Sequence, residues 1–409
     1  MQTFTPFQYI KLDIANSFGL DDKLFQERLD WFEANKDNLA GLVNASEEPA
    51  QFYAGILAYQ DVMSGTPTGY LVGMDATASG LQCIAALCGC PVTASSVNMV
   101  DPDKRKDVYT DGYHIMLEKL DGKMDKFERK PVKGATMTNF YGSMANPRKL
   151  FGENSKELAT FYEMLEVIAP GGQALKNDLI SIWQPGVLQH SWTLPDGFEA
   201  VVKVITTHED SFEVNELKSS FTHRYHVNEG QDAGLSLAAN TIHSVDGFVV
   251  REMNRRANYD RNKVRDVVEW IDTALSGEAH SSDFEVEPQY ARLIKIWKQC
   301  RLTSIRIIDY ITPFNVAQMP NQMMVELQDI LKGMLQYKPF PLICIHDCFK
   351  CHPNYMNHVR QNYINIFMQL ADSKMLESMV QDITGKHTPV RKLTRNLSSL
   401  IEQSNYMLS

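Results

Sequence analysis

The stretch Leu71–Gln82, LVGMDATASGLQ, decides how the rest of the chain is interpreted. Its apolar start predicts a buried strand, and this strand delivers one carboxylate, Asp75, to its end. Small residues follow, from Ala76 to Gly80, and leave room beside that carboxylate. A carboxylate at a strand end with space next to it suits a metal ion and a bulky anionic substrate. Many aspartates in such positions serve structure alone.

A second aspartate of the same kind lies far downstream, in PLICIHDCF. There Asp347 also follows an apolar run, and His346 precedes it. If the two strands are neighbours, both carboxylates reach one point. Two magnesium ions held by two aspartates stabilise the attacking and the leaving oxygen of a phosphoryl transfer. The backbone carbonyl of Ala76 is a further candidate ligand, because magnesium takes oxygen donors. Together, Asp75 and Asp347 predict a metal-dependent site.

Between the two aspartates, residues 129–142 (RKPVKGATMTNFYG) predict a helix, with a proline in its first turn and a glycine at its end. Arg129, Lys133, Met137 and Tyr141 are spaced by four residues and therefore lie along one face. Cations near a helix start add to the positive end of the helix dipole, which suits a triphosphate. Tyr141 is placed to stack on a nucleotide or to hydrogen-bond with it. The simpler alternative is a solvated basic face above a core aromatic residue.

The composition bounds the class of protein. A chain of 409 residues, 44% of them hydrophobic, is long enough for two or three subdomains around a large core. The sequence shows no signal-peptide pattern and no apolar run long enough for a membrane span, so we expect a soluble, intracellular protein. Seven cysteines, an odd number, fit reduced thiols better than a disulfide framework. A net charge of −10 argues against a protein that coats nucleic acid, but it permits a local basic groove.

Hydrophobic periodicity divides the chain into mostly helical segments with few strands. Alternation of apolar and polar residues predicts a hairpin at about 204–228, and three helical stretches predict a helical subdomain at about 258–335. The other segments with a helical pattern are 9–44, 48–63, 83–90, 104–120 and 155–183.

The order of these motifs resembles that of the bacteriophage-type single-subunit RNA polymerases. Asp75 with GLQ, then R-x3-K-x3-MT-x2-YG, then His346-Asp347 are similar to the A, B and C motifs of that family. Three further segments agree in order: YIKLDIANSFGLDD near the start, WTLPDGF at 192–198 and HSVDG at 243–247. The resemblance therefore covers nearly the whole chain.

The resemblance implies an α/β (α+β) right-hand polymerase fold, mostly helical, with a small antiparallel palm sheet. It divides the chain into the first part of the palm (1–110), the fingers (111–242) and the second part of the palm (243–409). The last range contains the helical insertion and a C-terminal tail. The insertion is either a docking surface for a partner or a solvated decoration.

The resemblance also assigns roles to single residues. Asp75, Asp347 and the Ala76 carbonyl hold two Mg²⁺ ions, and His346 belongs to the same motif. Lys133 binds the triphosphate and protonates the leaving pyrophosphate, while Arg129 pairs with the outer phosphates.

Sugar choice follows from four other positions. Tyr141 and His243 are expected near the incoming ribose and the new base pair. Gly80 stands where related DNA polymerases carry a glutamate that blocks a 2′-hydroxyl, so the space is expected to be open. Met137 stands where the related DNA polymerases usually have a bulky aromatic residue. The sequence thus favours a DNA-directed RNA polymerase, a nucleotidyltransferase. The alternatives are a DNA polymerase or primase of the same fold, or a non-catalytic transcription accessory protein.

The resemblance further implies partners. No promoter-binding N-terminal domain, thumb or template-gripping D-x-x-G-R element is found, as in the split heterodimeric enzymes of N-four-like phages. We therefore expect this chain to be the larger, catalytic subunit and a second protein subunit to supply those parts. The other expected partners are a single-stranded or opened DNA template, nascent RNA and ribonucleoside triphosphates, with no membrane. The expected location is the cytoplasm of an infected bacterium.

Two further patterns concern promoter recognition and metal binding. The hairpin at 204–228 lies where the family reads promoters, but four acidic residues there would repel phosphates and predict weak recognition of duplex promoters: Glu209, Asp210, Glu213 and Glu216. Cys348-x-x-Cys351-His352 superficially matches a zinc or haem pattern. It overlaps the His346-Asp347 motif, and its nearest complementary pair in the sequence is Cys88 and Cys90, so we do not expect a metal site there.

Overall fold

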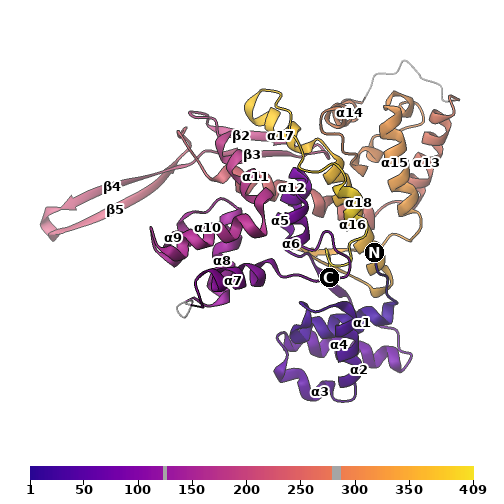
Figure 1. The fold of residues 1–409 in the computed structure, drawn as a ribbon. Coiled ribbons are helices and arrows are strands. Elements are labelled where there is room, and N and C mark those ends of the chain that lie inside the picture. Colours follow the sequence, from indigo (N-terminus) through magenta and orange to yellow (C-terminus); the bar gives the residue numbers. More distant parts are fainter. Residues whose placement is uncertain (123–126, 279–286) are drawn as a thin grey trace.

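A computed structural model describes residues 1–122, 127–278 and 287–409. This part of the chain is mostly helical, and Figure 1 shows the helices arranged in lobes around a small central sheet. The sheet has three antiparallel strands in the order β1-β7-β6. The strands are β1 (Val72–Asp75), β6 (Ile343–Ile345) and β7 (Cys348–Cys351).

The sheet joins two segments that are distant in the sequence. In the β1–β7 register Asp75 lies opposite Cys348, and Val72 lies opposite Cys351. Strands were expected before both aspartates, and both are found. Asp347 lies in the tight turn between β6 and β7, one residue before β7 begins. The fold therefore brings the ends of the two apolar runs to the same end of the sheet, on either side of β7.

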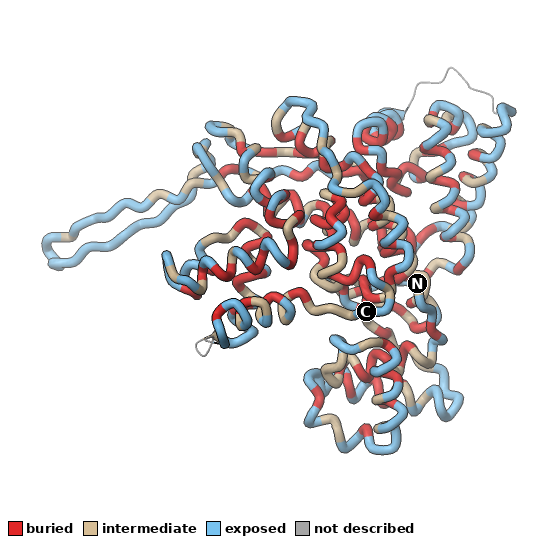
Figure 2. The backbone as a smooth tube through the Cα atoms, viewed as in Figure 1, coloured by how far each residue is buried: buried red, intermediate tan, exposed pale blue. Residues whose placement is uncertain are grey.

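The helix after β1 is the centre of the molecule. Helix α5 (Ser79–Cys88) is buried at every position from Ser79 to Leu87, as expected of a helix that is apolar on nearly all sides. It packs against α11 (Pro170–Ser181), α12 (Ser236–Ala257) and α16 (Met356–Asp372). Figure 2 shows this buried interior between the exposed outer helices.

The first 63 residues form a helical lobe, drawn in indigo in Figure 1. Asp13 ties this lobe to the sheet, because its carboxylate accepts hydrogen bonds from the Gly73 amide (2.8 Å) and the Tyr70 hydroxyl (2.5 Å). The elements of the lobe are α1 (Pro6–Ala15), the π-helix η1 (Asn16–Leu20), α2 (Phe25–Asn35), α3 (Leu39–Leu42), η2 (Val43–Ala45) and α4 (Pro49–Met63).

A second group of helices follows α5. The segment 155–183 is helical, as expected, and consists of two helices that meet at Pro170. The ring of this proline replaces the amide hydrogen, and the preceding Ala169 adopts a non-helical conformation. The helices of this group before α11 are α6 (Pro91–Ser96), α7 (Val108–Lys119), α8 (Arg129–Phe140), α9 (Ala145–Phe151) and α10 (Lys156–Ile168).

Two hairpins come next. The first pairs β2 (Gln189–Thr193) with β3 (Glu199–Lys203) and packs onto the body. The second pairs β4 (Thr206–Val214) with β5 (Ser219–Val227) through the short turn η3 (Asn215–Leu217), as expected for residues 204–228. This second hairpin projects from the body (Figure 1) and is exposed along most of its length (Figure 2).

The remainder is helical apart from β6 and β7. The helical pattern of the sequence extends over residues 289–308, but helix α14 ends at Cys300, where Arg301 adopts a left-handed conformation. Residues 279–286, inside the expected insertion, lie outside the described residues. The elements are α13 (Arg261–Leu275), α14 (Pro288–Cys300), η4 (Ile305–Asp309), η5 (Val316–Gln318), α15 (Asn321–Met334), η6 (Pro353–Tyr355), α17 (Met375–Thr384) and α18 (Leu397–Ile401).

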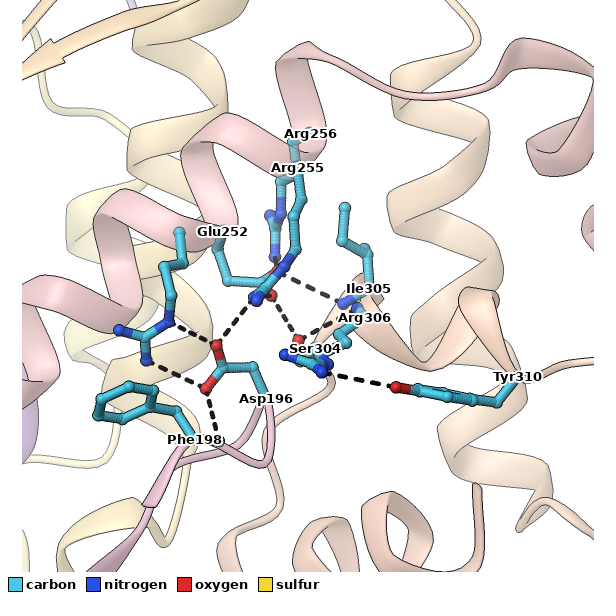
Figure 3. A network of polar contacts seen from close by, with 10 residues as sticks. Asp196, Phe198, Glu252, Arg255, Arg256, Ser304, Ile305, Arg306 and Tyr310 are labelled. Atoms are coloured by element: carbon cyan, nitrogen blue, oxygen red, sulfur yellow. Dashed lines mark hydrogen bonds and ion pairs between the residues drawn. The ribbon is translucent and has the colours of Figure 1, made fainter. Parts of the chain in front are cut away.

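A network of buried charges fixes α12 in place (Figure 3). Asp196, in the β2–β3 turn, is fully buried and accepts two hydrogen bonds from Arg251, at 2.7 and 3.1 Å, and one from Arg255, at 2.9 Å. Glu252, also fully buried, accepts hydrogen bonds from Ser304 and from the Ile305 amide at the start of η4. The WTLPDGF segment and the α14–η4 connection are thereby bonded to the same helix.

Within the described part of the chain, the helices are all too short or too polar to cross a lipid bilayer.

Candidate active site

The structure brings Asp75 and Asp347 together. Asp75 ends β1, and the Ala76 amide directly after it donates a hydrogen bond to the Asp347 carbonyl at 3.1 Å. Burial raises the pKa of the Asp347 carboxyl above its usual value, and the nearby charge of Asp75 raises it further. The Cys348 thiol is hydrogen-bonded to Asp75, and burial together with this contact raises the pKa of the thiol. The Asp347 carboxyl and the charge of Asp75 that acts on it therefore share one end of the sheet.

Unfavourable backbone conformations flank both carboxylates. Ala78 has φ of 55° and precedes α5, and His346 has φ of 55° in the β6–β7 turn. A left-handed conformation costs a residue with a Cβ about 1–2 kcal/mol. His346 itself is exposed, and its backbone shapes the turn that carries Asp347. The surrounding fold thus holds both aspartates through strained neighbours.

The C-terminal segment packs against the same strand end. The Thr77 amide donates to the Met407 carbonyl at 3.1 Å, and the Ser409 amide donates to the Asp75 carbonyl at 3.0 Å. These two bonds form the bridge between Ala76 and Leu408, and they do not use the Ala76 carbonyl. That oxygen therefore stays a candidate ligand beside the carboxylates.

Helix α8 presents the predicted face. Arg129, Lys133 and Met137 are exposed, and Tyr141, the residue after the helix, is half-buried. Gly142 follows with φ of 92°, a conformation that suits glycine and ends the helix, as expected. The spacing of four residues therefore gives one cationic face with an aromatic residue at its far end.

Both cations of this face contact helix α7. The Arg129 Nε donates to the Thr110 hydroxyl at 2.6 Å, and its Nη2 pairs with the Asp107 carboxylate. The Lys133 Nζ lies 5.1 Å from the centroid of the Tyr109 ring. Asp107, which caps α7, and Tyr109 and Thr110 in its first turn belong to no motif singled out in the sequence. Their contacts with Arg129 and Lys133 depend on how α7 packs against α8.

Tyr141 and His243 lie together, their ring centroids 4.4 Å apart. The space beside Gly80, expected to be open, is partly occupied by Tyr141: a Cβ on Gly80 would lie 2.2 Å from the Tyr141 hydroxyl. The absence of a side chain at position 80 thus makes room for a tyrosine of the protein itself. A cavity of about 90 Å³ remains, lined by Gly80, Tyr141, Tyr109, Met137 and Asp347 among others.

Asp246 is a site residue that the sequence reasoning missed. Burial and the charge of Asp347 raise the pKa of its carboxyl to about 6. Ser79 is hydrogen-bonded to both Asp246 and Asp347, so it connects α12 to the turn that carries Asp347. A signal was present, because Asp246 follows His243 by three residues and such pairs share a helix face.

The described residues contain no cluster of three or more histidine, cysteine, aspartate or glutamate side chains arranged to hold a metal ion. Asp75 and Asp347 are thus considered as a pair of carboxylate ligands. Magnesium is commonly bound by one or two carboxylates, with water and substrate phosphates completing its shell.

Known proteins that resemble this chain match its first part. Residues 4–159 match the family model for DNA-dependent RNA polymerase. The mitochondrial DNA-directed RNA polymerase of Neurospora crassa is 29% identical over 161 residues, which is 33% of this chain and 11% of the relative. The DNA-directed RNA polymerase of Pseudomonas phage phiKMV is 32% identical over 130 residues, 28% of this chain and 16% of the relative.

The chain thus aligns with less than a fifth of either relative's length. The matched segment contains Asp75, Arg129, Lys133 and Tyr141, whereas His243 and Asp347 lie beyond it. Residues 4–159 are therefore similar in sequence to the DNA-dependent RNA polymerases of a phage and of fungal mitochondria.

Proposed function

We propose that this chain catalyses DNA-templated RNA synthesis by nucleotidyl transfer. The observation that carries the proposal is the meeting of Asp75 and Asp347 beside the cationic face of α8. The family match covers Asp75 and α8, and the sheet supplies Asp347 from outside the matched segment.

The donor atoms suit magnesium. The Asp75 and Asp347 carboxylates and the Ala76 carbonyl are oxygen donors, which magnesium prefers. The raised pKa of Asp347 indicates that the protein alone leaves its negative charge poorly compensated, and a bound cation would offset that charge. We assign two Mg²⁺ ions to these residues. When bound, they supply charge stabilisation for the oxygens that exchange bonds at phosphorus.

The chain's own residues then orient the substrate. Arg129 and Lys133 bind the triphosphate of the incoming nucleotide, and Lys133 Nζ donates a proton to the leaving pyrophosphate. Tyr141 and His243 lie beside the ribose, with the Tyr141 hydroxyl held over Gly80. Catalysis by such a site is mostly positioning and stabilisation of charge.

The test uses tagged protein purified from its native host with its associated proteins, supplied with Mg²⁺ and a single-stranded DNA template. We expect RNA from ribonucleoside triphosphates, much less product from deoxynucleotides, and loss of synthesis in Asp347→Asn. The matched control is Asp329→Asn, an exposed aspartate on α15. Equal RNA synthesis by the Asp347→Asn and native proteins would refute the proposal.

A finer proposal concerns a second chain. By resemblance to the split enzymes of N-four-like phages, we assign this chain to the catalytic subunit of a heterodimer that works in the cytoplasm of an infected bacterium. The partner chain is expected to lengthen the RNA made per binding event. Long products from this chain alone, unchanged by added partner, would rule out that division of labour.

A last part of the proposal concerns the template. Four acidic residues on the β4–β5 hairpin predict that duplex promoters bind weakly, so a single-stranded or opened template is needed. We expect the affinity for any one duplex sequence to fall steeply with salt. Tight, salt-resistant binding to a single duplex would contradict this expectation.

A further inference from the structure

We propose that Asp107, Tyr109 and Thr110, at the start of α7, position Arg129 and Lys133 to receive the triphosphate of the incoming nucleotide. This inference rests on the proposed function and adds three positioning residues to it.

Asp107 connects the two helices through its two carboxylate oxygens. Oδ1 accepts the amide hydrogens of Tyr109 (2.9 Å) and Thr110 (3.2 Å), which caps α7. Oδ2 accepts from the Thr110 hydroxyl at 2.8 Å and pairs with Arg129. Burial raises the pKa of Asp107, but the hydrogen bonds from Thr110 and the charge of Arg129 outweigh burial and hold this pKa below its usual value. Asp107 is therefore an anion that the amides at the start of α7 hold in place.

Arg129 is held on one side and open on the other. Its Nε and Nη2 are bonded to Thr110 and Asp107, whereas its Nη1 has no hydrogen-bond partner among the residues that the structure describes. A guanidinium fixed in this way loses less conformational entropy when it binds phosphate. The amide dipoles at the start of α7 also offset part of the negative charge of Asp107.

Lys133 is held without being neutralised. The face of the Tyr109 ring attracts the ammonium, which lies 5.1 Å from the ring centroid. A carboxylate in that place would compete with phosphate for the same charge, and an aromatic face does so far less. Tyr109 also lines the cavity with Tyr141 and Asp347, so the ring connects the cationic face to the catalytic end of the sheet.

The test measures steady-state kinetics of the native holoenzyme and its variants on a single-stranded template. We expect Asp107→Asn and Thr110→Val each to raise the KM for ribonucleoside triphosphates about fivefold to tenfold, with kcat changed less than about twofold. Tyr109→Leu should raise KM similarly, whereas Tyr109→Phe, which keeps the ring, should stay near the native value. The inhibition constant of inorganic tripolyphosphate should rise in parallel, and template affinity should not change.

A double-mutant cycle separates positioning from general stability. In an Arg129→Ala background, Asp107→Asn should raise KM less than about twofold further, because the residue through which it acts is gone. Thermal unfolding checks that each variant folds. If Asp107→Asn does not fold, the KM of Thr110→Val decides the test.

Three outcomes would overturn the inference: an unchanged or lowered KM in Asp107→Asn and Thr110→Val, a full additional effect of Asp107→Asn in the Arg129→Ala background, or equal losses in Tyr109→Phe and Tyr109→Leu. Failure of the proposed function looks different, because the native holoenzyme would then make no RNA at all.

Discussion

At the scale of single residues, Gly80 shows how closely the candidate site is packed. An alanine Cβ at this position would lie 2.2 Å from the hydroxyl and 2.9 Å from the Cζ of Tyr141, so the tyrosine would have to move. We expect Gly80→Ala to reduce the preference for ribonucleotides over deoxynucleotides by about tenfold or more, because small displacements in an active site are costly. The measurement is the ratio of kcat/KM for the two substrates.

The control for this prediction is Gly134→Ala in α8. A Cβ there meets nothing within 4 Å, so the substrate preference should persist. The same change should stabilise the helix by about 0.5–1 kcal/mol. An unaltered substrate preference in Gly80→Ala would mean that Tyr141 does not control the sugar.

Asp13 provides a prediction about pH. Burial raises the pKa of its carboxyl from 3.8 to about 6, and the hydrogen bonds from Gly73 and Tyr70 only partly oppose this. Because the pKa is higher in the folded state, ionisation of Asp13 costs stability as pH rises from about 4 to about 6.

An asparagine at position 13 avoids this cost. The free energy of unfolding of Asp13→Asn, relative to the native protein, should therefore increase by about 1.4 kcal/mol between about pH 5 and about pH 7.5. Urea titrations at the two pH values measure the change. A difference that stays constant with pH would show that Asp13 ionises normally.

At the scale of elements, α12 depends on the β2–β3 turn. Asp196 is fully buried between Arg251 and Arg255, and its pKa is lowered because the two arginines outweigh the effect of burial. On the same helix, the Ser244 hydroxyl accepts a hydrogen bond from Trp192 at 2.9 Å. Since α12 also carries His243 and Asp246, the turn supports the candidate site from a distance.

We expect Asp196→Ala to lower the free energy of unfolding by about 2–3 kcal/mol, because it removes a buried carboxylate and leaves two partly buried arginines without this partner. Denaturant titration measures this loss. The control is Glu199→Gln, an exposed residue at the start of β3 in the same hairpin, which should change stability by less than about 0.5 kcal/mol. Equal effects of the two variants would mean that the network in Figure 3 contributes little.

The sequence predicted the parts of the site that periodicity can show. Apolar runs placed Asp75 and Asp347 at strand ends, and spacing by four residues placed Arg129, Lys133, Met137 and Tyr141 on one face. These patterns are local, and local patterns are read directly from residue order.

The remaining features depend on packing between distant segments. Asp107 acquires its partner only when α7 lies against α8, and Asp246 approaches Asp347 only when α12 lies against α5. The conformation of Ala78 was equally hidden, because alanine has no preference for left-handed backbone and the surrounding fold imposes it. The Tyr141 hydroxyl over Gly80 is a contact of the same kind.

At the scale of the whole molecule, the β4–β5 hairpin differs from the rest because it makes few buried contacts with other segments. The body is held by buried contacts between segments from both ends of the chain, such as the Arg360 hydrogen bonds to the Gln2 and Asn405 carbonyls, at 2.8 and 2.7 Å. The hairpin instead projects away from it, exposed on both faces (Figure 2). Its tip carries Lys218 in a left-handed conformation.

This shape has a consequence for proteolysis. Trypsin should cut first at the tip, after Lys218, and divide the chain into two fragments, 1–218 and 219–409, that denaturing gels resolve. Because β1 from the first fragment pairs with β7 from the second, the nicked protein should still elute as one particle in gel filtration. The nicked particle would then keep Asp75 and Asp347 on separate polypeptides, each contributing one carboxylate to the candidate site.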